Sequence, residues 1–165
     1  MMKHLSKLSA ALLTAAALAA PVQAQNASEI AKAQAGKSCA GCNLFQADFS
    51  YLSMKNASFE GARLRQSDMF VSVMDGVNFS KANLSLADLF GGRFQNADFS
   101  GANLEGATLV GGWFGGANFA GANLTGANLS GAEMKTAKGL TQSQLNSACG
   151  DSATELPGEL FVSQC

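Results

Sequence analysis

A large apolar residue recurs at every fifth position of this chain between residues 44 and 134. These positions are Leu44, Phe49, Met54, Phe59, Leu64, Met69, Met74, Phe79, Leu84, Leu89, Phe94, Phe99, Leu104, Leu109, Phe114, Phe119, Leu124, Leu129 and Met134. A period of five matches neither an α-helix, which repeats every 3.6 residues, nor a β-strand, which alternates every two. The pattern therefore predicts repeated units that consist of one short extended segment and one turn.

A second period, of twenty residues, sorts the large positions into columns. Every twentieth residue from Leu44 to Leu124 is Leu, and every twentieth residue from Phe59 to Phe119 is Phe. Like residues stack on like when successive turns of a repeat lie in register. The sequence thus predicts a coil of four sides with five residues on each side.

Small residues precede the large ones by two positions, and in one column the small residue is smaller where the large one is larger. Asn or Asp commonly stands between the two, and Gly often follows the large residue by two positions. One column pairs Ser72 with Met74, Gly92 with Phe94, and Gly112 with Phe114. The small residue becomes Gly where the large one becomes Phe, which indicates volume compensation in a packed interior.

The stretches "ANLSLADLF", "NADFSGANLEGATL" and "ANFAGANLTGANLSGA" make the chain resemble the pentapeptide-repeat family, whose units look like Ala-(Asp/Asn)-Leu-Ser-Gly. The resemblance covers residues 39–138. It implies an all-β solenoid, a right-handed quadrilateral β-helix of about five coils, whose small and large positions point inward. With coils about 4.8 Å apart, such a rod is roughly 24 Å long.

The segment before the repeat predicts an export signal and a cap. Residues 1–24 have a basic start, an apolar run from Leu8 to Ala20 and small residues up to Ala24, which is typical of a secretory signal peptide. The run is too short to span a bilayer. We therefore expect a periplasmic or secreted protein with no membrane insertion in its mature form. Residues 25–38 are expected to cap the open end of the solenoid, with a short helix over 28–36 that Ser28 begins and Gly36 ends.

Residues 139–165 are expected to form a C-terminal helix and a disulfide-closed tail. Thr141 and Gln144 have the spacing of a capping box, and Leu145 supplies an apolar face. This stretch also resembles the tail that closes many exported pentapeptide-repeat proteins.

The four cysteines lie in two pairs at opposite ends of the repeat, Cys39 with Cys42 and Cys149 with Cys165. Four cysteines in an exported chain suggest two disulfides, and the two ends are too far apart to share a zinc ion. We therefore expect a disulfide within each pair. A redox role for the CAGC motif stays open as an alternative, although thioredoxin-type motifs begin a helix and this motif enters a coil.

Composition and charge exclude several classes of function. The chain has a net charge of −1, and without residues 1–24 it keeps nine basic and twelve acidic side chains, a net charge of about −3. There is no basic footprint for nucleic acid or for an anionic membrane. The single His, His4, lies in the predicted signal peptide. The mature chain thus lacks a His for general-base catalysis or metal binding, and we expect no catalytic site, no cofactor and no resident metal.

Apolar residues line one outer edge of the predicted rod. This candidate interaction edge comprises Tyr51, Phe70, Val71, Val73, Phe90, Arg93, Val110 and Trp113. Exposed apolar patches commonly mark contact surfaces, and Trp and Arg are frequent binding hot spots. Three explanations stay open: the tail folds back over the edge through Leu156, Leu160 and Phe161, a second copy of the chain binds it, or another protein does.

An acidic column of Asp48, Asp68 and Asp88 runs beside this edge. Carboxylates stacked at strand spacing repel one another. Either they accept hydrogen bonds at the turns, or they form a weak cation site, such as one for Ca²⁺, although no loop encloses them.

The function expected from these features is a non-enzymatic structural or protein-interaction module. Some pentapeptide-repeat proteins resemble duplex DNA and shield gyrase, so a DNA-mimic inhibitor is the alternative that the resemblance implies. The low net charge and the export signal disfavour that alternative.

Overall fold

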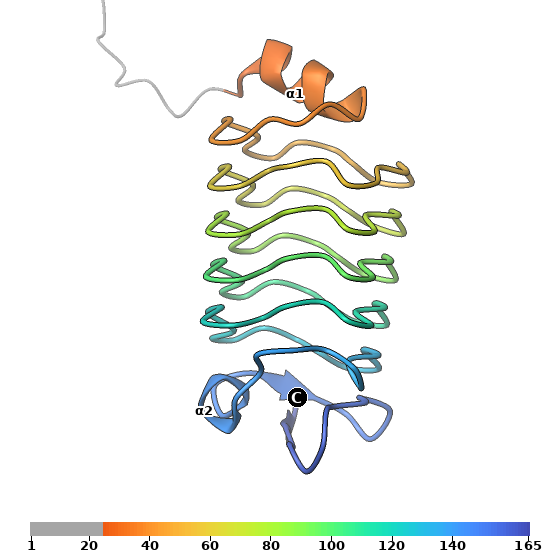
Figure 1. Cartoon of the computed structure of the whole chain (residues 1–165). Coiled ribbons are helices and arrows are strands. Elements are labelled where there is room, and N and C mark those ends of the chain that lie inside the picture. Colours follow the sequence, from red (N-terminus) through yellow and green to blue (C-terminus); the bar gives the residue numbers. More distant parts are fainter. Residues whose placement is uncertain (1–24) are drawn as a thin grey trace, which may run out of the picture.

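The chain winds into a stack of similar coils. The computed structural model describes residues 25–165, and the predicted signal peptide lies outside these described residues. Helix α1 (Ala27–Gln34) covers one end of the stack, and the C-terminal tail covers the other (Figure 1). Isolated parallel bridges join residues twenty apart, from Asn43 with Arg63 to Asn118 with Lys138. The bridges confirm the period of twenty, since they place each side on the same side of the next coil.

The interior of this β-solenoid is filled by the residues that recur every five positions. Every large position from residue 44 to residue 134 is at most 3% exposed. The Phe column stacks along the axis, with ring centroids 5.2 Å apart between Phe79 and Phe99 and 5.0 Å apart between Phe99 and Phe119. The core is thus a continuous ladder of aromatic and aliphatic side chains.

A second ladder explains the glycines at the small inward positions. The rings of Phe94 and Phe114 stack at 5.2 Å with an interplanar angle of 6°. A Cβ atom added to Gly92 would lie 2.5 Å from the Phe94 ring, and one added to Gly112 would lie 2.6 Å from the Phe114 ring. The volume compensation in the sequence is therefore steric: Gly stands where the neighbouring ring needs its space.

Each side ends in a hydrogen-bonded turn that fixes a corner of the coil. At one corner the Ser72 N–H donates to the Met69 carbonyl at 3.1 Å. The Asp68 carboxylate accepts the N–H of Phe70 at 2.8 Å. Val71 has a φ of +51°, the left-handed conformation required at the third residue of a type II turn. A β-branched residue is strained there.

The N-cap of helix α1 lies two residues before the residue that the sequence predicted. Its N-cap is Asn26, whose Oδ1 accepts the Glu29 N–H at 3.3 Å. The expectation that Ser28 caps the helix is wrong, because its hydroxyl instead donates to Asn26 Oδ1 at 2.8 Å. Gly36 follows the helix with a φ of +74°, which agrees with its expected role as the stop.

Side chains of α1 cover the open backbone of the first coil. Glu29 Oε2 accepts the Asn43 N–H at 2.6 Å, and Gln34 Nε2 donates to the Asp48 carbonyl at 2.7 Å. Ala33 is fully buried against the core. The helix thus supplies partners that a preceding coil would otherwise supply, and it protects the exposed edge.

Helix α2 (Gln142–Leu145) performs the same task near the other end. Thr141 and Gln144 form the expected capping box, and Leu145 is buried. The Gln144 side chain also donates to the carbonyls of Phe119 at 2.8 Å and Ala122 at 2.9 Å. One residue therefore caps the helix and satisfies the backbone of the coil beneath it.

The tail after α2 continues the stack. Strand β1 (Cys149–Gly150) pairs in parallel with β2 (Ser163–Gln164). Further bridges join Asn128 with Cys149 and Glu133 with Glu155. The structure contains both of the disulfides expected from the sequence, Cys39–Cys42 and Cys149–Cys165. In the chain-entropy treatment, closing the longer loop stabilises the tail by about 3 kcal/mol.

Candidate interaction surface

The outer corner at residues 70 and 90 carries aromatic rings, of which Phe90 is exposed and Phe70 is half-buried. Phe70 and Phe90 stack with centroids 5.3 Å apart and an interplanar angle of 9°. Tyr51 meets Phe70 edge-on at 5.5 Å. Tyr51 is 72% exposed and Phe90 is 41% exposed, and Val110 continues the column with partial burial. We call Tyr51, Phe70, Phe90 and Val110 the aromatic ridge.

Hydrogen bonds hold the ridge in place. The side chains of Asp68 and Asp88 accept the N–H groups of Phe70 at 2.8 Å and Phe90 at 2.9 Å. The Tyr51 N–H donates to the Phe70 carbonyl at 2.9 Å, which ties one corner to the next. The rings are therefore displayed by a rigid scaffold rather than by a mobile loop.

The acidic column beside the ridge is used for hydrogen bonding within the chain. Asp48 Oδ1 accepts from both the hydroxyl and the N–H of Ser50, at 2.6 and 2.9 Å. These two donors hold the pKa of Asp48 below its ordinary value. The turn interpretation of this column is thus confirmed. Within residues 25–165, no group of three acidic, His or Cys side chains is placed to hold a metal ion.

On the other flank of the ridge, Arg93 and Trp113 differ in their surroundings. Val73, Arg93 and Trp113 lie in one column, joined by parallel bridges. The Arg93 guanidinium forms a two-bond ion pair with Asp75, with Nε 3.1 Å from Oδ1. Arg93 is therefore engaged within the chain, whereas Trp113 is 49% exposed.

Trp113 lines a shallow depression whose other residues the sequence analysis did not single out. Gln95, Glu133, Lys135 and Glu155 form part of its wall. Glu133 follows Trp113 by twenty positions, and Gln95 precedes Lys135 by forty. Residues separated by multiples of twenty lie in one column, so sorting the sequence by this period could have grouped these residues.

The C-terminal tail leaves Tyr51 and Phe90 of the candidate interaction edge exposed and approaches the edge at Trp113, where Glu155 lines the depression. Leu156 and Leu160 pack against the hydrophobic core, and the tail lies at the end of the stack (Figure 1). The Leu129 N–H donates to the Cys149 carbonyl at 2.7 Å, and the Met134 N–H donates to the Glu155 carbonyl at 2.8 Å. The proposal that the tail folds back over the edge is wrong, because the open backbone of the last coil is where the tail binds.

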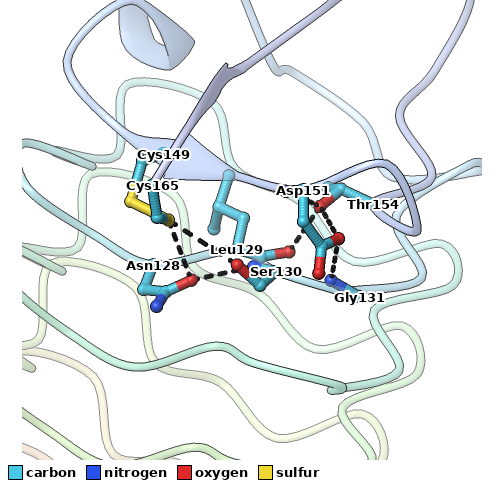
Figure 2. Close-up of a disulfide and its surroundings, with 8 residues drawn as sticks. All are labelled: Asn128, Leu129, Ser130, Gly131, Cys149, Asp151, Thr154 and Cys165. Atoms are coloured by element: carbon cyan, nitrogen blue, oxygen red, sulfur yellow. Dashed lines mark hydrogen bonds between the residues drawn. A yellow bond between two sulfur atoms is a disulfide. The ribbon is translucent and has the colours of Figure 1, made fainter.

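Figure 2 shows the contacts between the disulfide-closed tail and that last coil. Cys165 Sγ lies 3.3 Å from Asn128 Oδ1, and Thr154 Oγ1 donates to the Leu129 carbonyl at 3.0 Å. Asp151 Oδ1 accepts the Gly131 N–H at 2.9 Å. The Gly131 N–H, the largest of several hydrogen-bond contributions, lowers the pKa of Asp151. The tail is thus held by side chains as well as by strand pairing.

The family model described as pentapeptide repeats matches in eight copies, over residues 38–69, 72–106 and 102–138. The chain belongs to the pentapeptide-repeat family. No curated protein matches the sequence. Across residues 25–165, no helix is long and apolar enough to cross a membrane.

Several solved pentapeptide-repeat structures match part of this chain. Trypsin-treated QnrB1, a plasmid-mediated fluoroquinolone resistance protein, is 21% identical over 68% of this chain and 60% of its own, with a TM-score of 0.44. HetL, involved in heterocyst differentiation regulation in the cyanobacterium Nostoc sp. strain PCC 7120, is 22% identical over 77% and 65% of the two chains, with a TM-score of 0.36. Rfr23 from the cyanobacterium Cyanothece 51142 is 21% identical over 78% and 97%, with a TM-score of 0.36. This chain therefore spans less than two thirds of the first two, and these likenesses concern the fold alone.

Proposed function

We propose that this pentapeptide-repeat protein is an exported, non-enzymatic interaction module that recognises another protein through its aromatic ridge. In this proposal it is a right-handed rod of about five coils with helical caps, and it acts in the periplasm or outside the cell. The observation that carries the proposal is the open stack of Phe70 and Phe90 with Tyr51 against it. Exposed aromatic groups on a rigid support are typical anchors of protein interfaces.

The sequence outside the ridge supports export and a non-catalytic role. Residues 1–24 have the pattern of a secretory signal, and the mature sequence contains no His. Both disulfides suit an oxidising compartment. Cys39 is almost fully buried, which favours a structural disulfide over the thiol-redox alternative, because redox cysteines are accessible.

The test compares wild-type protein with a Phe70→Ser/Phe90→Ser variant. Ser50 and Ser130 occupy the same column, so the variant is expected to fold. Leu86→Gln is the matched control, because Leu86 is an exposed apolar residue at another corner and Gln46 and Gln66 precede it in its column. Proteins cross-linked to the wild type in envelope extracts are identified, purified and bound again to all three forms.

We expect a purified partner to bind the wild type and Leu86→Gln equally and to bind the ridge variant at least tenfold more weakly. Light scattering across a concentration series tests whether the partner is a second copy of the chain. Equal binding of the partner to all three forms would place recognition elsewhere and overturn the proposal.

A further inference from the structure

The aromatic ridge is flanked along one side by carboxylates that carry no ion pair. Parallel bridges join Asp48 with Asp68 and Asp68 with Asp88. This places the three one coil apart, at about 4.8 Å. The two ion pairs found among the described residues involve Glu60 and Asp75. The column of Asp48, Asp68 and Asp88 therefore presents unneutralised negative charge directly beside exposed aromatic rings.

These carboxylates are held in fixed positions next to the ridge. Asp68 Oδ1 and Asp88 Oδ1 accept the N–H groups of Phe70 and Phe90 themselves. Each acidic side chain thus lies two residues from the ring it accompanies, and its orientation is set by the same hydrogen bond that shapes the turn. At this corner, the acidic column and the aromatic ridge therefore run side by side, and each of these coils contributes a residue to each of them.

We propose that this corner binds a cationic amphipathic helix of a partner protein, which lies along the rod axis. The inference rests on the proposed function and names its partner class. The apolar stripe of the helix packs on Phe70 and Phe90, and Lys or Arg side chains on its flank reach the acidic column. Long cationic side chains suit this arrangement, because their methylene stems cover apolar surface while their charged ends contact carboxylates.

Charge complementarity selects the sign of the partner. Like charges stacked one coil apart repel each other, and an acidic partner would add to that repulsion. A basic partner relieves it, and the complementary potential speeds association as well as fixing the register of the complex.

The spacing of the coils selects a helix over an extended strand. Apolar residues on one helix face recur every three to four residues, an advance of about 5.3 Å, whereas residues on one face of a strand recur about every 6.7 Å. Against a coil rise of about 4.8 Å, a helix falls out of step by about 1.5 Å over three coils and a strand by about 6 Å. Only the helix can place a side chain on each successive residue of the aromatic ridge.

The test uses synthetic peptides of eighteen residues. The probe has Leu at helix-face positions and Lys on both flanks of that face. A second peptide carries Glu in place of Lys. A third keeps the Leu and Lys residues of the probe but contains Pro residues that prevent a helix. Binding to the full mature chain is measured by fluorescence anisotropy at low and at physiological salt. We expect the Lys helix to bind at least tenfold more tightly than either control peptide, and its affinity to fall as salt rises.

Matched variants separate the acidic column from overall charge. Asp48→Asn/Asp68→Asn/Asp88→Asn removes three charges and keeps the turns, because Asn78 and Asn128 accept the equivalent N–H bonds from Ser80 and Ser130. The control Asp98→Asn/Glu105→Gln/Glu159→Gln removes three charges elsewhere.

We expect the column variant to bind the Lys helix at least tenfold more weakly than the wild type, and the control variant to bind it within twofold of the wild type. Equal loss in both variants, or no preference for the Lys helix over the other peptides, would overturn the inference. If the natural partner is lost from Phe70→Ser/Phe90→Ser but still binds the column variant, the proposed function survives and the cationic helix does not.

Discussion

Two adjacent glycines, Gly111 and Gly112, are favoured for different physical reasons. Gly111 has a φ of +63°, and a Cβ atom there would meet open space. Gly112 points inward, where a Cβ atom would lie 2.6 Å from the Phe114 ring. The first glycine is favoured by its backbone torsion and the second by the volume it leaves to its neighbour.

Alanine substitutions should separate these two reasons. Gly111→Ala should lower the free energy of unfolding by about 1 kcal/mol, through torsional strain alone. Gly112→Ala should cost about 1–3 kcal/mol through overpacking. Phe114→Met should cost less in the Gly112→Ala background than in the wild type, because the same two columns hold Ala132 with Met134. Urea unfolding of the four proteins measures this coupling, and strictly additive changes would contradict the steric explanation.

The C-terminal tail is an element whose attachment depends on one carboxylate. Asp151 Oδ1 accepts from the N–H groups of Gly131 at 2.9 Å and Ala153 at 3.0 Å, and it lies 3.2 Å from the Thr154 hydroxyl, whose one proton it shares with the Leu129 carbonyl. The Gly131 N–H is the largest cause of its lowered pKa. Because the folded pKa lies below the unfolded one, ionised Asp151 stabilises the tail above about pH 4, and this contribution is lost as the pH falls through the folded pKa.

Asp151→Asn is therefore expected to abolish a pH-dependent part of the stability of the tail. Asn can accept the same hydrogen bonds but does not titrate, and bonds to an ionised acceptor are the stronger ones. Near neutral pH the wild type should melt at a higher temperature than the variant, and the two melting temperatures should converge as the pH falls through the folded pKa of Asp151. Thermal unfolding from pH 7 to pH 2 measures the difference, and a difference that does not change with pH would contradict this role.

The elements that repeat could be predicted from the sequence, because their register is redundant. Each inward position recurs every twenty residues with the same or a similar side chain, so the columns of Leu and Phe predicted the buried core. The capping box of Thr141 and Gln144 was also predictable, since it depends only on local spacing. The N-cap was not, because Asn26 and Ser28 are both good caps and only the geometry decides which one reaches Glu29.

The position of the tail could not be predicted from its apolar residues. Leu156 and Leu160 need an apolar surface, and both the outer edge and the open end of the rod offer one. Unpaired backbone groups at the end decide between them, because a hydrogen bond left unmade there would cost more than exposed apolar area on the side. The ion pair of Arg93 with Asp75 was not predicted either. Arg93 follows Asp75 by eighteen residues, two fewer than one full coil, so the two residues lie in neighbouring coils close to each other.

At the scale of the whole molecule, each coil contacts only the coils above and below it. Phe99 lies at the centre of this arrangement, stacked between Phe79 and Phe119 and edge-on to Phe94 and Phe114. A lesion in the middle of such a nearest-neighbour stack separates two halves, each of which has too few coils to bury its core well. A lesion at an end affects only the last coil.

Phe99→Ala should therefore destabilise the rod far more than the same change at its end. We expect it to lower the free energy of unfolding by about 3–5 kcal/mol, the cost of a large cavity, and to reduce hydrogen-exchange protection over residues 79–119. Phe49, which contacts the single ring of Phe59 among the aromatic pairs of residues 25–165, provides the control. Phe49→Ala should expose amides only in the first coil and leave the central protection unchanged. If both variants lost protection uniformly along the chain, the rod would unfold as one cooperative unit, and the independence of its coils would be refuted.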